Sequence, residues 1–202
     1  MKTLSAIRNF ARPRPVIKTE RCTLCGLALI AEHPHLVEKA TGKLLCACDG
    51  CAILFDGNVS EKFRRVSRDV HILNDFNLSD ELWDRLGIPI GMSFFYRHGS
   101  SGKIRAIYPS PAGPMESLLP LDVWDEVVRD NPQLKSLEPD IEGLLIHRVH
   151  AKRAYYRIPI DECYRLIGVI RAKWQGFSGG DEVTQAIDAF FNDLNVRGKV
   201  RA

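Results

Sequence analysis

The sequence lacks any long hydrophobic run, and this sets the first limit on its function. Its longest apolar stretch spans residues 24–31, far short of the roughly 20 residues that a membrane-spanning helix needs. It also lacks a leader in which basic residues precede an apolar segment and a small-residue cleavage site, so we expect a cytoplasmic protein. No internal repeat or low-complexity tract is visible.

The sequence also has little excess charge. A net charge of +3 is too small to indicate nucleic acid as a partner by itself, and the content of 45% hydrophobic and 26% charged residues is that of a soluble globular protein. Residues 1–21 are the exception, because they carry many basic residues against the single acid Glu20. We predict a basic N-terminal arm, which is either a solvated terminus or a segment that docks on an acidic partner or on nucleic acid.

Cysteine is scarce outside one short stretch. Five of the six cysteines lie within residues 22–51, where Cys22 and Cys25 form one C-x-x-C pair and Cys48 and Cys51 form another. A thiolate pair at this spacing suits a tight turn that directs both sulfurs at one ion. Two such turns supply a closed set of four thiolates, for which zinc is the usual ion. The alternative of structural disulfides is disfavoured because the stretch holds an odd number of cysteines and because no export signal is visible.

The residues around the two pairs leave further alternatives open. Cys46 precedes Cys48 by two positions and is either a small buried residue or a substitute for one ligand. Iron in the same thiolates, as a rubredoxin-type centre or with Cys46 as a small cluster, would make the protein an electron carrier. His33 and His35 lie between the pairs and could be outer-sphere partners of the metal.

The order of these motifs also resembles the treble-clef core of HNH nucleases. Glu32-His33 could imitate the acid–histidine pair with which those enzymes hold a catalytic cation. A further histidine or asparagine is needed just after the second cysteine pair, and residues 52–55 offer neither. The nuclease is therefore the lesser alternative.

The pattern predicts an α+β protein in three parts: the arm at residues 1–21, a four-cysteine module at 22–57 and an α+β domain at 58–202. In the module, the segments 32–38 and 43–47 form a hairpin of the kind found in zinc ribbons and treble clefs. In the domain, strands joined by short loops predict a mainly antiparallel sheet with helices packed on one face.

The helices and strands expected in this domain follow from local signals. Ser79 is a good cap for a short helix, and apolar periodicity predicts helices that begin near Asp161 and Ser178. The proline-rich segment 108–114 is expected to be a rigid loop that presents a surface. Strands are expected at residues 92–96, 103–108, 144–146 and 155–158.

Two sets of residues are weaker candidates for binding an anion. The first is a basic cluster between two expected strands, comprising His147, Arg148, His150 and Arg153. The second is Gly179 and Gly180 at a helix start, where free N–H groups could hold a phosphate, although simple helix capping is the favoured interpretation. Cys163 falls on the apolar stripe of its helix and is expected to be a core residue.

Several segments together resemble a bacterial protein family encoded beside high-affinity, actinobacterial-type nickel-iron hydrogenases. The segments that carry the resemblance span nearly the whole chain: 22–25, 33–36, 45–51, 87–89, 108–113, 116–121, 159–164 and 174–180. The resemblance implies a setting among hydrogenase accessory proteins and brings no catalytic residues with it.

We therefore expect a zinc-binding accessory protein without enzymatic activity, whose partner is a hydrogenase subunit or a maturation factor. A site with four protein thiolates leaves no position for a substrate. No constellation of catalytic side chains emerges elsewhere in the sequence.

Overall fold

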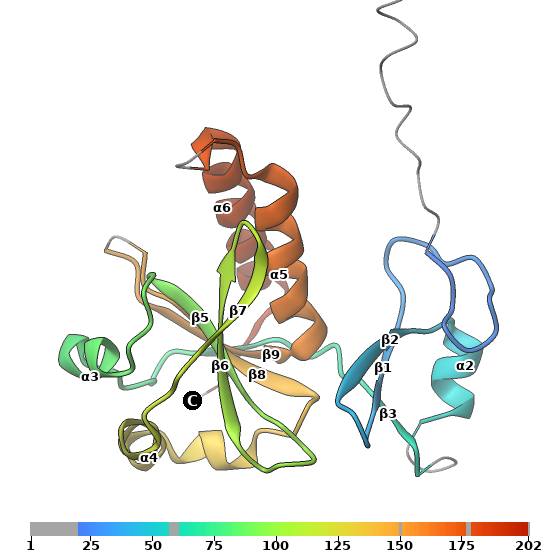
Figure 1. Ribbon diagram of the computed structural model, residues 1–202, viewed down its shortest axis with the longest axis horizontal. Helices are drawn as coiled ribbons and strands as arrows, with labels where there is room; N and C mark the ends of the chain where they lie inside the picture. The colour runs from blue at the N-terminus through green and yellow to red at the C-terminus, as the bar shows by residue number, and fades with distance from the viewer. Residues whose placement is uncertain (1–19, 57–60, 150, 177–178, 202) are drawn as a thin grey trace, which may run out of the picture.

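The computed structural model describes residues 20–56, 61–149, 151–176 and 179–201. Within them the chain forms a mixed α+β fold with two sheets, one of three strands and one of seven (Figure 1). The three-stranded sheet takes two strands from the four-cysteine module and a third from residues shortly after it, and we include this third strand in the N-terminal module from here on. The seven-stranded sheet is the centre of the remainder. Residues 1–19 of the basic arm lie outside the described residues.

The three-stranded sheet is built on the hairpin expected from the sequence. Strands β1 (His35–Glu38) and β2 (Lys43–Cys46) pair antiparallel, and β3 (Phe63–Arg65) pairs with the other edge of β1. Gly42 has a φ of +67°, a left-handed conformation that glycine adopts without strain in the turn between β1 and β2. Helix α2 (Asp49–Leu54) follows β2 directly and lies on the side of the module away from the large sheet (Figure 1).

The β1–β2 hairpin buries both of its faces. Leu36 pairs with Leu45, and both pack in a small cluster with Cys22 and Cys51. The alternate pair, Val37 and Leu44, packs instead against the core of the large domain. Because side chains alternate along a strand, the hairpin joins the cysteine cluster on one face to the large domain on the other.

The seven-stranded sheet has the order β10-β4-β9-β8-β5-β6-β7. Every neighbouring pair is antiparallel except β10 and β4, which are parallel. The sheet is therefore mainly antiparallel, as the short loops predicted. Its strands are β4 (His71–Leu73), β5 (Met92–Arg97), β6 (Ile104–Ser110), β7 (Gly113–Ser117), β8 (Glu142–His147), β9 (Ala154–Pro159) and β10 (Lys199–Arg201).

Helices cover both faces of this sheet, so the expectation of helices on one face holds only for the C-terminal pair. Helices α5 (Ile160–Lys173) and α6 (Gly180–Arg197) pack on the face that carries Phe94 and Leu145. Phe95 and Leu144 point to the opposite face and pack there against helices from the middle of the chain. Those elements are α3 (Asp80–Arg85), α4 (Leu121–Asp130) and the 3₁₀ helix η1 (Pro132–Ser136).

Two local predictions in this domain have different outcomes. Ser79 caps α3 as expected, because its side chain accepts a hydrogen bond from the N–H of Leu82 at 3.1 Å. The proline-rich segment 108–114 is not a separate rigid loop. It is the tight end of the β6–β7 hairpin, in which Pro109 pairs with Pro114 and Ser110 with Gly113.

Candidate metal centre

The first cysteine pair lies in a tight backbone turn. The N–H of Cys22 donates to the carbonyl of Leu27, and the N–H of Gly26 donates back to the carbonyl of Cys22, each at 2.8 Å. Gly26 has a φ of +77°, which closes the turn. The N–H of Thr23 donates to the carbonyl of Cys46, also at 2.8 Å, and so fixes the turn to the end of β2.

The second pair lies at the start of α2. Cys48 is the N-cap of the helix, and its sulfur accepts a hydrogen bond from the N–H of Cys51 at 3.4 Å. This hydrogen bond ties the Cys48 sulfur to the first turn of the helix, where one of the N–H groups lacks a partner within the helix.

The four sulfurs converge on one point, although they come from two separate segments. Each lies within 4.8 Å of the other three, and the sulfurs of Cys25 and Cys48 are 3.7 Å apart. Sulfurs that share a tetrahedral ion at about 2.3 Å lie about 3.8 Å from one another. The four cysteines could therefore bind one metal ion with little rearrangement.

The electrostatics of the cluster also favour a cation. Burial, together with the sulfurs of Cys48, Cys25 and Cys22, raises the pKa of Cys51 to about 12. Burial acts in the same direction on Cys22, but backbone N–H groups donate to its sulfur and lower its pKa to about 6. The backbone thus stabilises one thiolate, whereas further negative sulfurs repel one another unless a cation lies between them.

Cys46, His33 and His35 form a second group rather than a shell around the first. The sulfur of Cys46 and one ring nitrogen of each histidine all lie within 4.8 Å of one another. Cys46 is directly opposite His35 in the β1–β2 ladder, on the hairpin face that carries Val37 and Leu44. The structure therefore places Cys46 with the two imidazoles and not among the four converging sulfurs.

The basic cluster between β8 and β9 does not form an open anion site. His147 is buried at 3% exposure, and its ring stacks on Phe191 with centroids 3.9 Å apart. Arg148 is also buried; its guanidinium donates to the carbonyl of Leu78 at 2.8 Å and pairs with Asp80. Arg153 pairs with the same carboxylate at 3.1 Å. His150 lies outside the described residues.

The two remaining candidates, the glycine pair at the start of α6 and Cys163, are explained by packing rather than by ligand binding. The N–H of Gly179 donates to the carbonyl of Gln175 at 3.1 Å, and the N–H of Gln175 donates to the carbonyl of Gly179 at the same distance. A Cβ on Gly179 would meet Val183 at 2.8 Å, so close packing accounts for glycine there; α6 begins at Gly180. Ser178 lies outside the described residues. Cys163 is fully buried, and burial raises its pKa well above the usual value, as expected of a core thiol.

Comparisons with known proteins give a family but no activity. The model of a family described as "Family of unknown function (DUF5947)" matches residues 21–198. No curated protein and no solved structure matches the chain. Among the described helices, none has both the length and the apolar character needed to cross a membrane.

Proposed function

We propose that this chain, which belongs to the family DUF5947, is a zinc-binding accessory protein that acts by contact with another protein. The convergence of four sulfurs within 4.8 Å carries the proposal. Four protein thiolates fill a tetrahedral shell and leave no position for a substrate, which is the pattern of a structural zinc site. The ion then holds the N-terminal module in shape.

The arrangement of the module supports a treble clef rather than a zinc ribbon. One cysteine pair lies in a turn, a hairpin follows, and the second pair lies at the N-terminus of a short helix. In a zinc ribbon both cysteine pairs typically lie in hairpin-like turns. Here the second pair lies at the start of α2, with Cys48 as its N-cap and Cys51 in its first turn. Its exposed residues Ile53 and Leu54 offer no ligand atom, which argues against the HNH nuclease alternative.

The surface of the same module supports a role in protein contact. Leu27 and Ile30 follow the first cysteine pair and are 58% and 74% exposed. On α2, Ile53 and Leu54 are 67% and 57% exposed. Large apolar side chains concentrated on a small module favour a protein partner. The resemblance to proteins encoded beside nickel-iron hydrogenases makes a hydrogenase subunit or maturation factor the partner that we propose.

Metal analysis and a visible spectrum of anaerobically purified protein test the nature of the ion. Zinc in the four-thiolate site gives no visible absorption, because its d shell is full. A colourless protein with zinc supports the proposal. A red or brown protein with iron in these four cysteines would show an electron carrier instead.

Co-purification from the native bacterium tests the partner. We expect the tagged protein to retain a hydrogenase subunit or maturation factor, and deletion of the gene to lower hydrogenase activity or assembly. The double variant Ile53→Glu, Leu54→Glu should lose the partner while it keeps its zinc. Val196→Glu is the matched control, because Val196 is an apolar residue of α6 with 85% exposure. Unaltered hydrogenase in the deletion strain, with no hydrogenase protein recovered, would refute this partner.

A further inference from the structure

His33, His35 and Cys46 are brought together by the register of the β1–β2 hairpin. His35 and Cys46 are directly opposite one another across the ladder, where Cβ atoms lie about 5 Å apart. His33 precedes β1, and its ring centroid is 4.8 Å from that of His35. The sulfur and one nitrogen of each ring lie within 4.8 Å of one another.

The hydrogen bonds of the two histidines determine which ring nitrogen is free. Nδ1 of His33 is 2.8 Å from the carbonyl of Ile30, and Nδ1 of His35 is 2.9 Å from Oδ2 of Asp161. A carbonyl and a carboxylate only accept hydrogen bonds, so each Nδ1 carries the proton. Nε2 of each ring is then the nitrogen available to coordinate a metal ion, while Nδ1 is held by its acceptor, as in many metal-binding histidines.

Nε2 of His33 is buried without a hydrogen-bond partner among the described residues. The side chain is only 5% exposed, and the carboxylate of Glu20 is 3.7 Å away, beyond hydrogen-bond distance. A buried polar atom that lacks a partner is costly, so such atoms are rare without a reason. A metal ion between His33, His35 and Cys46 would supply the missing partner.

We propose that His33, His35 and Cys46 bind a second divalent transition-metal ion of the zinc or cobalt type. Two imidazoles and one thiolate form a donor set suited to such borderline ions. This site is separate from the four-cysteine centre, since the two sites lie on opposite faces of the hairpin: Leu36 and Leu45 face the four cysteines, whereas His35 and Cys46 lie on the face of Val37 and Leu44.

The second ion differs from the first because one coordination position stays open. Three protein ligands leave the fourth position of a tetrahedral ion to water or a small ligand, as in catalytic zinc sites. His33 and His35 line a cavity of about 630 Å³ between the module and the start of α5. Ser67, whose buried Oγ has no partner among the described residues, and Arg68 also line it. A small anion could reach the ion from this cavity.

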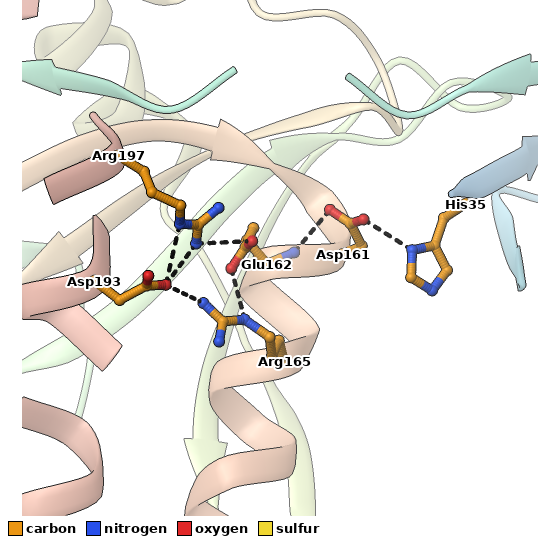
Figure 2. A network of polar contacts seen from close by, with 6 residues as sticks. All are labelled: His35, Asp161, Glu162, Arg165, Asp193 and Arg197. Carbon is orange, nitrogen blue, oxygen red and sulfur yellow. Dashed lines mark hydrogen bonds and ion pairs between the residues drawn. The ribbon is translucent and has the colours of Figure 1, made fainter. Parts of the chain in front are cut away.

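Asp161 is the positioning residue of this site, because it orients His35 without contacting the ion. Figure 2 shows the carboxylate between the His35 ring and the first turn of α5, where its Oδ1 accepts from the N–H of Glu162 at 2.9 Å. Glu162 is held in turn by Arg165 at 2.8 Å and Arg197 at 3.0 Å. The large domain thus fixes a ligand that the N-terminal module supplies.

Cobalt titration of the full-length metal-free protein tests the proposal, and it does so independently of the protein partner. We expect two Co²⁺ ions per chain, with separable visible spectra for an S₄ and an N₂S site. The variants His35→Ala and Cys46→Ser should bind one ion and keep the S₄ spectrum, which also shows that the module is folded. His98→Ala, in the β5–β6 turn, is the matched control and should bind two ions. Azide should change the N₂S spectrum and leave the S₄ spectrum unchanged.

Asp161→Asn provides a second test that keeps an oxygen acceptor near His35. We expect the second ion to bind about 10–100-fold more weakly, as for other residues that orient a metal-bound histidine, with the S₄ ion unaffected. One Co²⁺ ion per wild-type chain, or two in His35→Ala with unchanged spectra, would overturn the proposal. If Cys46→Ser and His35→Ala both lose both ions, the Asp161→Asn variant becomes the test of the second site. Unchanged affinity for the second ion in that variant would also overturn the proposal.

Discussion

The N-terminal module and the seven-stranded domain are stabilised in different ways. Among the described residues, the module's own cluster contains seven buried side chains, and two of these are the candidate ligands Cys22 and Cys51. The sheet of the large domain has a buried cluster on each face, of 20 and 16 residues. A small cluster rarely folds unaided, whereas a sheet with two packed faces does not need a metal. A metal ion bound by the four cysteines would therefore stabilise the module rather than the large domain.

The two regions are nevertheless joined by a shared face. Val37 and Val66 belong to the core cluster of the large domain, although Val37 lies in β1 of the three-stranded sheet and Val66 directly follows β3. His35 pairs with Asp161 across the same boundary. A module that loses its metal should therefore loosen first on the face of Leu36 and Leu45.

Cys51→Ser should have the largest effect, and it should be confined to the module. It removes one ligand from a site of a kind that contributes on the order of 10 kcal/mol to folding. We expect loss of the S₄ metal and rapid proteolysis between residues 20 and 56, with the large domain intact. Ile53→Ala, on the exposed side of α2, is the control and should keep metal and protease resistance. A metal-free variant that resists protease as the wild type does would break the comparison.

Phe94→Ala should destabilise the large domain without affecting the metal. Phe94 is 1% exposed on the face covered by α5 and α6, and truncation of a buried phenylalanine costs about 3–5 kcal/mol. Urea unfolding followed by tryptophan fluorescence measures this loss. Leu118→Ala, at a residue with 96% exposure, should change the free energy of unfolding by less than about 0.5 kcal/mol. Metal content should remain that of the wild type in both.

Glu142→Gln should have the next largest effect, because it leaves a charged group poorly paired. Glu142 and Arg157 form an ion pair at 2.5 Å, and their side chains are only 11% and 13% exposed. Removal of one charge from such a pair costs about 3 kcal/mol. The control is Asp188→Asn, since the Asp188–Lys152 pair is about half exposed and such pairs contribute about 0–1 kcal/mol. Equal unfolding midpoints for the two variants would contradict this assignment.

Ser79→Ala should have the smallest effect of the series. It removes the hydrogen bond from the N–H of Leu82 to the cap of α3, a loss of about 1 kcal/mol. Leu82 and Trp83 keep α3 packed against the sheet. We expect a lower thermal midpoint with unchanged metal content, and Ser79→Asp should restore it because aspartate is an equally good cap. A midpoint unchanged by Ser79→Ala would show that the cap contributes nothing.

The sequence was informative wherever a short-range rule applies. The C-x-x-C spacing located the four converging cysteines, the strand signals at 32–38 and 43–47 located the hairpin, and Ser79 located the start of α3. Because side chains alternate along a strand, the sequence also predicts which residues share a face once the register is known. Each of these signals acts over a few residues, so no tertiary information is needed.

The features that the sequence did not reveal depend on long-range packing. The β1–β2 register pairs His35 with Cys46; counting back from the turn at Gly42 could have found this pair. No such signal places Asp161 beside His35, because 126 positions separate them. The parallel pairing of β10 with β4 and the burial of Arg148 likewise depend on how distant segments meet.

Hydrogen exchange with and without zinc tests whether a metal ion organises the module and not the large domain. Metal-free full-length protein is compared with the zinc-loaded form, and amide protection is followed by mass spectrometry. We expect zinc to protect amides at residues 20–56, above all those of β1, β2 and α2, while the strands β5, β8 and β9 are protected in both forms. Equal protection of residues 20–56 with and without zinc would contradict it.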